Sequence, residues 1–494
     1  MKLLFIDTAY ESLGIEYLSG ALKSAGHVTE LAFEAGLSET LYFPKKKKRT
    51  HSFVLKKIKY FNPGLVMFTS TTNLFPWVKE VSSAIKEHFA VPILVGGIHP
   101  TILPEETIAH PAIDMVCRGE GDEAIVELVG KMESKNDYFN TRNFWFKTND
   151  GIIRNPLRPL IQNLDSLSLP DKEMYKRSGF PLKRVYLQMS RGCPYRCPYC
   201  YNHQLQKLYK VHNHIYYRRR SVASVISEFQ DYKKRYGSKS AYFYDNTFNY
   251  GNDWLFEFLS EYCKKVALPF SCYLRADLID EKIVKALKKA NCKWAYIGVE
   301  SGNETIRRKI LKRNISSEKI MDSVQILKEN NIKVVTFNMF GLPGEGSEEM
   351  FDTAEMNLKM KPNAVATFTF YPFPETDLTK EAIEKGYIDS EVLEKIKNGE
   401  SNWTEESILK HPYKQLAYNL KIILPLLNKM PKFMRPFFLK NWALKRHSSS
   451  LLYFLKIISL PVVHSPWETI ERVKEALSVY RQSLFQFIKY FFKY

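Results

Sequence analysis

The feature that most restricts the fold is an alternation of short apolar strands with amphipathic helices, which occurs twice along the chain. In the first block, strands are expected at 3–6, 28–33, 65–69, 92–95 and 113–117, and helices at 13–25, 77–88 and 123–132. Alternation of this kind is typical of a parallel sheet with helices on both faces. We therefore expect residues 1–140 to form a doubly wound, Rossmann-like α/β domain, with a ligand beyond the carboxyl ends of its strands.

Residues 141–182 interrupt this alternation. Strand-forming residues at 144–146 and 152–153 flank an Asn-Asp-Gly turn at 149–151, which is typical of a β-hairpin. Several prolines follow the hairpin. We therefore expect a hairpin and then an extended linker between two larger domains.

The second block of alternation, over residues 183–385, predicts a partial (β/α)6 TIM-like barrel. Its strands are expected at 185–189, 241–244, 270–274, 294–299, 334–340 and 364–371. Sites on such barrels lie at the carboxyl ends of the strands. The remaining residues, 386–494, are expected to be helical, basic and aromatic. They would either pack on the barrel, beside the substrate, or lie on an anionic membrane surface.

The net charge and the number of cysteines limit the cellular location and the binding partners that this protein can have. The formal net charge is +19, which favours an anionic partner, although the basic run 45–49 is equally well explained as a solvated loop. A nucleic-acid-binding protein with a structural metal is one alternative, but no RNA-binding aromatic motif or helix-turn-helix pattern supports it. Scarce cysteines, no signal peptide and no apolar run long enough to cross a bilayer predict a cytoplasmic protein, with contact at the inner face of the membrane as an alternative.

Three of the seven cysteines, Cys193, Cys197 and Cys200, fall within eight residues that follow the first expected barrel strand. Iron–sulfur clusters are held by cysteine thiolates, normally four of them. Three clustered thiolates without a fourth indicate a [4Fe–4S] cluster with one open iron. A zinc site completed by His203 is the alternative, and the odd number of cysteines disfavours a disulfide framework.

The cysteine motif, with Tyr199 as the aromatic residue before the last cysteine, resembles the signature of the radical S-adenosylmethionine (SAM) superfamily. The order of motifs along the chain resembles the subclass of that superfamily with a cobalamin-binding domain. The segments that carry this resemblance lie at 13–18, 96–101, 118–121, 169–171, 297–302 and 371–374.

The resemblance implies that the three cysteines hold a [4Fe–4S] cluster and that SAM chelates the fourth iron. SAM would be cleaved to methionine and a 5′-deoxyadenosyl radical, with the electron supplied by an external donor of the flavodoxin or ferredoxin type. Further SAM contacts are implied at Tyr199, Asp245, Asn246, Arg275, Glu300 and Ser301.

Other readings of these strand-end residues remain open. Asn246 stands where the family usually has a second acid, so its charge-dependent role is in question. Arg275 could instead pair with Asp277 or Asp280, and Glu300 and Ser301 could make hydrogen bonds within the barrel rim.

The N-terminal block resembles a cobalamin-binding domain, but Ala9 stands where many such domains have the histidine that ligates cobalt. The resemblance therefore implies cobalamin bound without a histidine ligand. The implied contacts are Ser70, Thr71, Thr72, Gly96, Gly97 and His99. Two alternatives stay open: His99 could merely hold its loop, and the domain could be a Rossmann-like cover that binds no corrin.

Taken with these motifs, the resemblance predicts a cobalamin-dependent radical SAM methyltransferase acting on a small or lipophilic substrate. A radical SAM cyclase or hydroxylase, of the anaerobic porphyrin ester cyclase type, is the nearest alternative. Specificity depends on loops and on the C-terminal region, so the substrate itself is not predicted.

Overall fold

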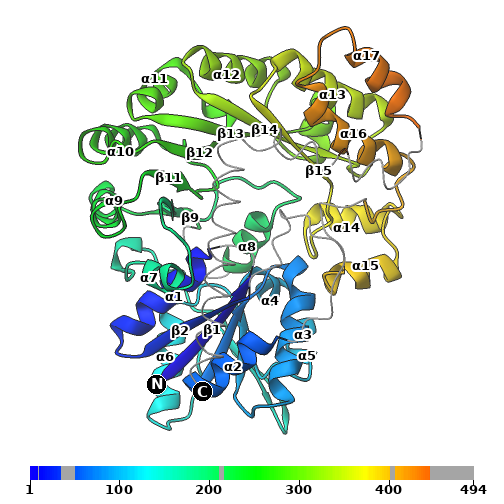
Figure 1. The fold of residues 1–494 in the computed structure, drawn as a ribbon. Helices are drawn as coiled ribbons and strands as arrows, with labels where there is room; N and C mark the ends of the chain where they lie inside the picture. The colour runs from blue at the N-terminus through cyan, green and yellow to red at the C-terminus, as the bar shows by residue number, and fades with distance from the viewer. Residues whose placement is uncertain (9–10, 35–50, 211–215, 401–406, 446–454, 456–494) are drawn as a thin grey trace.

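A computed structural model describes residues 1–8, 11–34, 51–210, 216–400, 407–445 and 455 of the 494-residue chain. Figure 1 shows one α/β domain built around the N-terminal sheet and a second built around a curved sheet with an outer row of helices. Helix α8 (Tyr201–Lys210) lies between them. The expected α/β class is confirmed.

The N-terminal sheet has seven strands in the order β2-β1-β3-β4-β5-β6-β7. These are β1 (Lys2–Thr8), β2 (Val28–Glu34), β3 (Leu65–Thr69), β4 (Ile93–Gly96), β5 (Met115–Cys117), β6 (Phe144–Thr148) and β7 (Gly151–Arg154). The first five are parallel, so their carboxyl ends meet at one edge. The strand order changes direction beside β1, as in other doubly wound sheets.

Helices cover both faces of this sheet, as the predicted doubly wound fold requires. One apolar core joins β1 and β2 to α1 (Leu13–Ser24) and α6 (Asp122–Glu133). The other joins β1 and β3 to α2 (Ser52–Phe61), α3 (Phe75–Lys86) and α5 (Pro104–Ala109). Two short helical segments, η1 (Thr72–Leu74) and α4 (Ile98–Ile102), begin just after β3 and β4.

The predicted hairpin forms, but it is not a separate connecting element. Strand β6 pairs antiparallel with β5, and β7 pairs antiparallel with β6, so the hairpin extends the N-terminal sheet. Buried Phe144 and Phe146 add to the core on the α1 and α6 face. Apolar burial on that face explains why the hairpin docks on the sheet.

The segment expected to be an extended linker contains η2 (Leu164–Ser166) and helix α7 (Lys172–Arg177), which docks on the N-terminal domain. The Lys172 ammonium is fully buried, with Nζ 2.6 Å from both Glu11 Oε1 and Glu16 Oε2. The Tyr175 hydroxyl donates a hydrogen bond to Asp7. Burial raises the pKa of Asp7 to about 7, although this hydrogen bond lowers it.

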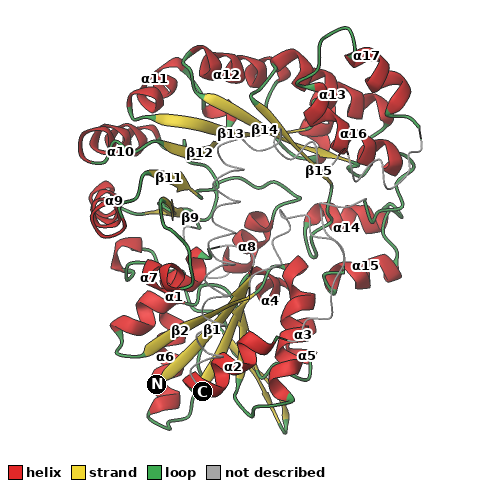
Figure 2. Cartoon of the chain, viewed as in Figure 1, coloured by secondary structure: helices red, strands yellow, loops and turns green. Residues whose placement is uncertain are grey.

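The second sheet has six parallel strands in the order β8-β11-β12-β13-β14-β15, which confirms the partial (β/α)6 barrel. The strands are β8 (Arg184–Leu187), β11 (Ser240–Phe243), β12 (Phe270–Leu274), β13 (Cys292–Glu300), β14 (Lys333–Phe340) and β15 (Ala364–Thr369). The outer helices are α9 (Val222–Tyr236), α10 (Asn252–Lys265), α11 (Glu281–Lys289), α12 (Ser317–Glu329) and α13 (Ser347–Met360). Figure 2 shows these helices on the convex side.

Local signals set the ends of several barrel helices. Side chains of Ser221, Asp280 and Ser316 accept hydrogen bonds from backbone N–H groups in the first turns of α9, α11 and α12. Gly237, with φ of 60°, ends α9 in the left-handed conformation that glycine adopts without strain. These caps precede or follow apolar stripes that pack on the strands.

The described C-terminal region comprises α14 (Asp377–Glu384), α15 (Ser390–Lys397), α16 (Lys414–Leu427), α17 (Arg435–Phe437) and η5 (Phe438–Trp442). Helix α16 packs its apolar face on β15 and α13, with Leu420 and Leu424 fully buried. The basic run 45–49 and the apolar segments at 451–463 and 483–494 lie outside the described residues, except for 455. No helix in the described parts of the chain is long and apolar enough to span a membrane.

Candidate active site

The cysteine loop begins at a small antiparallel ribbon, β9 (Ser190–Arg191) with β10 (Arg218–Arg219), which follows β8. All three of its thiols are free and partly exposed. The Cys193 Sγ lies 3.7 Å from Thr247 Oγ1, and Asn202 Nδ2 lies 3.7 Å from Cys200 Sγ. Burial raises the pKa of the Cys200 thiol to about 11, so iron must displace a proton when it binds there.

The donor set of this loop fits a [4Fe–4S] cluster better than a zinc ion. Within the described residues, no group of three His, Cys, Asp or Glu side chains closes around one ion. A cubane cluster does not need such a group, because each thiolate binds a different iron. His203, the fourth ligand in the zinc alternative, instead places Nε2 3.0 Å from Asp377 Oδ2 on α14.

Asp245, expected to contact SAM, lies beneath the cysteine loop. Its buried carboxylate accepts hydrogen bonds from Met189 N, at 3.1 and 3.2 Å, and from the Ser190 hydroxyl. Exposed Asn246 donates to Gly192 O at 3.2 Å. These two residues of the loop after β11 therefore support the backbone that leads into Cys193, and a SAM contact for either stays a prediction.

Tyr199 belongs to a buried polar group that the sequence did not reveal. Its hydroxyl lies 3.3 Å from Arg313 Nη1, and Arg313 also donates to Gly298 O at 2.7 Å and lies 3.5 Å from Glu300 Oε1. Burial raises the pKa of Glu300, against the lowering effect of Arg313. Arg313 thus joins the cysteine loop to the carboxyl end of β13.

Two other expected SAM residues have protein partners in the structure. The Arg275 fork pairs with Asp277, at 3.0 and 2.9 Å, and its guanidinium lies 3.4 Å from the centre of the Tyr195 ring. The Ser301 hydroxyl is buried 3.3 Å from Thr353 Oγ1 on α13. The alternatives considered for both residues are therefore present, and their SAM contacts remain predictions.

Helix α8, which follows the cysteines, lies against the carboxyl edge of the N-terminal sheet. At its start, Tyr201 OH is 3.2 Å from Thr72 Oγ1, and at its end Tyr209 OH accepts a hydrogen bond from Glu120 N at 3.1 Å. Two loops of the N-terminal domain, after β3 and after β5, therefore touch the same helix. The edge where doubly wound sheets bind ligands is thus adjacent to the cysteine loop.

Most of the residues expected to contact cobalamin are hydrogen-bonded among themselves. Ser70 Oγ donates to Thr71 O at 2.9 Å, and Thr71 Oγ1 donates to Asn73 Oδ1 at 2.7 Å. Gly97, with φ of 104°, is needed because a Cβ there would lie 2.8 Å from Ser70 O. At Gly96 a Cβ would make only an ordinary contact of 3.6 Å. The missing side chain of Gly97 therefore lets the backbone at Ser70, just after β3, approach closely. A contact between Gly97 and the nucleotide part of cobalamin remains a prediction.

His99 is the residue at this edge that fits a bound ligand. It is fully buried, yet neither ring nitrogen has a hydrogen-bond partner among the described residues. Its ring packs on Phe75, with centroids 4.1 Å apart and the ring planes tilted by 31°. Burial lowers the pKa of His99 to about 3, so the imidazole is neutral and offers one donor and one acceptor. A polar cofactor at this edge, such as cobalamin, would satisfy those atoms.

The concave face of the barrel sheet is lined with aromatic rings. Every strand contributes at least one, and neighbouring ring centres lie 5.0–6.0 Å apart. The rings belong to Tyr186, Tyr242, Tyr244, Tyr273, Tyr296, Phe337 and Phe368. This face lies opposite the one that packs on α9 to α12.

The loop after β14 contains a buried carboxylate whose protonation can be tested. Glu345 Oε2 accepts hydrogen bonds from Gly341 N at 2.7 Å and Leu342 N at 3.1 Å. Burial raises the pKa of Glu345 to about 8, although both backbone bonds lower it. The folded state therefore binds this proton more tightly than the unfolded state, and the free energy of unfolding falls as the pH rises toward about 8.

Glu345→Gln has no such proton to lose. We expect its melting temperature, relative to that of the wild type, to increase from about pH 6 to about pH 9. Thermal scans across this range measure the difference, with Glu355→Gln on the exposed side of α13 as the control. Parallel curves for Glu345→Gln and the wild type would contradict the expectation.

Comparisons with known proteins agree with this geometry. Residues 187–356 match the model of the radical SAM superfamily, and residues 6–129 match that of the B12 binding domain. The first range contains the cysteine loop and four of the six barrel strands, β11 to β14, and the second contains β3, β4 and His99.

Relatives cover most of the chain. An uncharacterized methyltransferase of Pyrococcus horikoshii is 29% identical over 390 residues, which are 76% of this chain and 80% of the relative. The anaerobic magnesium-protoporphyrin IX monomethyl ester cyclase of Rubrivivax gelatinosus is 25% identical over 78% of this chain and 70% of its own length.

A solved structure shares the fold. The radical SAM methyltransferase TsrM from Kitasatospora setae, solved with cobalamin and a [4Fe–4S] cluster, superposes with a TM-score of 0.63 at 17% identity. The match covers 78% of this chain and 75% of TsrM. With the free cysteine loop at the carboxyl end of the first barrel strand and an N-terminal sheet of the matching kind, this chain combines a B12-binding domain at 6–129 with a radical SAM domain at 187–356.

Proposed function

We propose that this protein is a cobalamin-dependent radical SAM methyltransferase. One observation carries the proposal: the helix that follows the cysteine loop lies on the ligand-binding edge of the B12-binding domain, through Tyr201 and Tyr209. Both cofactors would then face one space between the domains. The relative from Pyrococcus horikoshii, named as a methyltransferase, supports the same activity.

The residues of this chain would mainly hold and orient the cofactors. When bound, the cluster and SAM supply a carbon-centred radical, and cobalamin supplies a methyl group. Asp245 holds the start of the cysteine loop, and Arg313 ties Tyr199 of that loop to the end of β13. The neutral His99 imidazole would hydrogen-bond the corrin periphery. An external one-electron donor is general to radical SAM enzymes, and we propose a flavodoxin or ferredoxin for this role.

The substrate class that fits the barrel best is a planar aromatic molecule. Rings that line every strand of the concave face offer stacking surfaces, and Tyr242 donates to Tyr273 OH at 2.8 Å within that lining. A relative named for magnesium-protoporphyrin IX monomethyl ester acts on such a molecule, which supports this class. The same relative also makes cyclisation the competing outcome.

Product mass separates the two outcomes. The protein is reconstituted anaerobically with iron, sulfide and cobalamin, after which it should hold about four irons per chain. It is then incubated with SAM, a reductant and planar acceptors such as magnesium-protoporphyrin IX monomethyl ester. A gain of one CH2 that carries label from methyl-labelled SAM supports methyl transfer. A product without that CH2 would favour the cyclase, and SAM cleavage without corrin binding would exclude both cobalamin-dependent readings.

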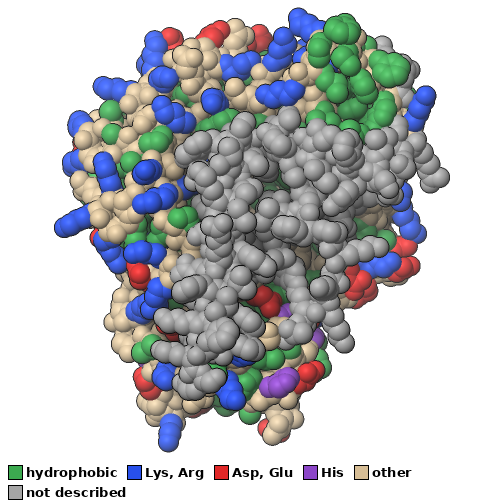
Figure 3. Space-filling model, in the orientation of Figure 1, with side chains coloured by type: hydrophobic (Ala, Val, Ile, Leu, Met, Phe, Trp, Pro, Cys, Tyr) green, Lys and Arg blue, Asp and Glu red, His purple; other side chains and the backbone are tan. Residues whose placement is uncertain are grey.

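We also propose that the protein is cytoplasmic and contacts the inner face of the membrane through its C-terminal region. Phe433 and Phe437 are 82% and 60% exposed beside Lys432, and Figure 3 shows hydrophobic side chains gathered over α17. Basic aromatic surfaces bind anionic lipid. We expect sedimentation with phosphatidylserine vesicles that is lost in Phe433→Ser/Phe437→Ser and kept in the control Ile383→Ser. Equal sedimentation of all three proteins would contradict the contact.

A further inference from the structure

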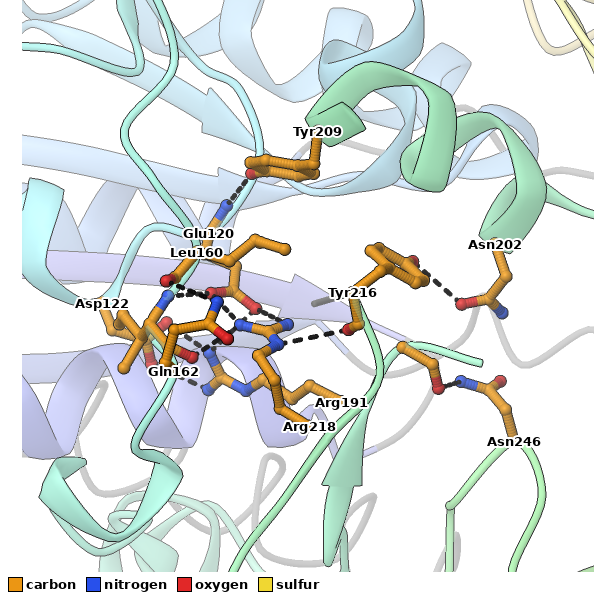
Figure 4. Close-up of polar contacts among 12 residues, drawn as sticks. Glu120, Asp122, Leu160, Gln162, Arg191, Asn202, Tyr209, Tyr216, Arg218 and Asn246 are labelled. Carbon is orange, nitrogen blue, oxygen red and sulfur yellow. Dashed lines mark hydrogen bonds and ion pairs between the residues drawn. The ribbon is translucent and has the colours of Figure 1, made fainter. Parts of the chain in front are cut away.

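The β9–β10 ribbon, which leads into the cysteine loop, also contacts the B12-binding domain. Arg191, two residues before Cys193, pairs with Arg218 across the β9–β10 ribbon. The partners of both guanidiniums lie in the loop after β5 and the first turn of α6, at the carboxyl edge of the N-terminal sheet. Figure 4 shows the two arginines side by side, facing Glu120 and Asp122.

Both contacts are two-pronged. Arg191 donates to Asp122 Oδ2 and Oδ1 at 2.8 and 3.0 Å. Arg218 donates to Glu120 Oε2 and Oε1 at 2.9 and 2.6 Å. Because a planar guanidinium matches a carboxylate at two atoms, each contact restricts orientation as well as distance. Two such contacts together restrict how the ribbon can rotate on the domain.

The four side chains are largely withdrawn from water. Their exposed fractions are 17% for Arg191, 6% for Asp122, 3% for Arg218 and 18% for Glu120. Burial raises the pKa of Asp122, but Arg191, a backbone N–H group and Arg218 together outweigh this and hold the pKa below its usual value. Apolar contacts would join two domains at a lower desolvation cost than buried ion pairs do. Buried ion pairs are therefore weak evidence for stability and better evidence for a defined relative position of the two domains.

The pairs also have further support on both sides. Arg218 Nη1 donates to Ile161 O at 2.8 Å, and Ile161 N donates to Glu120 Oε2 at 3.3 Å. The Arg191 guanidinium lies 5.2 Å from the centre of the Tyr17 ring on α1. The acidic loop, the segment after the hairpin and helix α1 therefore all meet at the base of the cysteine loop.

We propose that Arg191–Asp122 and Arg218–Glu120 form a clamp that sets the distance between the cluster and the corrin. The four are positioning residues: they act through the cysteine loop and the sheet edge, and touch neither reacting atom. The inference rests on the proposed function only in requiring both cofactors. It adds that relative cofactor placement is determined by these charges and not by the bulk of the domain interface.

The test is a distance between two paramagnetic centres. Full-length protein is loaded with the reduced [4Fe–4S] cluster and cob(II)alamin, and pulsed electron paramagnetic resonance measures the distribution of distances between them. The variants are Glu120→Gln, Arg218→Gln, the double variant Glu120→Gln/Arg218→Gln, and Arg218→Lys. Arg154→Gln is the matched control, because Arg154 makes a two-pronged pair with Glu105 that is exposed and lies within one domain.

If the clamp sets this distance, the wild type and the control should each show one narrow distribution of cluster–corrin distances. All four variants should show a broader distribution. Thermal stability separates this from a merely structural role. The single variants should be destabilised: Glu120→Gln leaves the buried Arg218 charge without its carboxylate, and Arg218→Gln leaves Glu120 with only the longer ion pair to Arg191, at 3.6 Å. The double variant should regain stability without regaining the narrow distance distribution. Arg218→Lys keeps the charge but not the fork, so it too should broaden the distribution.

An unchanged distribution in the double variant, with both signals present, would overturn the clamp and leave the proposed function standing. Recovery of the narrow distance together with stability in the double variant would also overturn it, because packing alone would then determine the placement. No corrin signal in the wild type would overturn the proposed function, and the clamp with it.

Discussion

Cys197→Ala is expected to abolish the cleavage of SAM to 5′-deoxyadenosine. Each thiolate of a [4Fe–4S] cluster binds its own iron, and the loop has no fourth cysteine that could replace Cys197. The substitution removes only a partly exposed thiol, so the fold should be unaffected. Anaerobic reconstitution followed by iron analysis and quantification of 5′-deoxyadenosine measures the loss.

Cys263→Ala is the matched control for this result. Cys263 is also free and partly exposed, but it lies on α10, where its thiol approaches Lys289 O at 3.4 Å. It should keep the iron content and the SAM cleavage of the wild type. Wild-type cleavage by the Cys197→Ala protein would mean that the loop does not hold the cluster.

Lys172→Met is expected to lower the free energy of unfolding by about 3–5 kcal/mol, because it leaves two buried carboxylates without a counter-charge. Lys172 is 0% exposed and bridges Glu11 and Glu16, which are 3% and 0% exposed. Burial raises the pKa of Glu16 well above its usual value, against the lowering effect of Lys172, so losing the lysine would favour the protonated acid further. Chemical denaturation of the full-length protein measures the change.

Two further variants identify the cause of that change. Lys359→Met removes a lysine from an exposed pair on α13, with the two side chains 72% and 51% exposed, and should change stability by less than about 1 kcal/mol. The triple variant Lys172→Met/Glu11→Gln/Glu16→Gln removes all three buried charges and should recover much of the lost stability. A triple variant no more stable than Lys172→Met would show that lost packing causes the effect.

The strands and helices were predicted well where the signal is local. Strands β3 and β12 have the predicted bounds, and α1 differs from its predicted range by one residue, since apolar period and capping residues are properties of adjacent positions. Helices α2 and α7 were missed. Helix α2 has only two buried residues and no side-chain cap, and α7 is a six-residue helix held by buried contacts with the distant N-terminal domain.

The contacts that the sequence did not show join residues distant along the chain. The hairpin was predicted, but its place in the N-terminal sheet was not, because nothing near it signals that β5 is its neighbour. Gly97 was predicted to contact a ligand, which stays a prediction, but the sequence did not show that its missing side chain also makes room for Ser70. Arg313 was not noticed, since its partner Tyr199 lies 114 residues away.

The sequence by itself determined the chemistry: the spacing of Cys193, Cys197 and Cys200 and the strand before them indicate the cluster, and the ordered motifs indicate the family. Only the tertiary structure decided how the two domains face each other. It brought Arg191 and Arg218 to Asp122 and Glu120, which lie 69 and 98 residues away, and buried the His99 ring with no hydrogen-bond partner among the described residues. Spacing along a chain encodes local geometry, whereas the pairing of buried charges depends on which surfaces meet, and the packing of the apolar cores decides that.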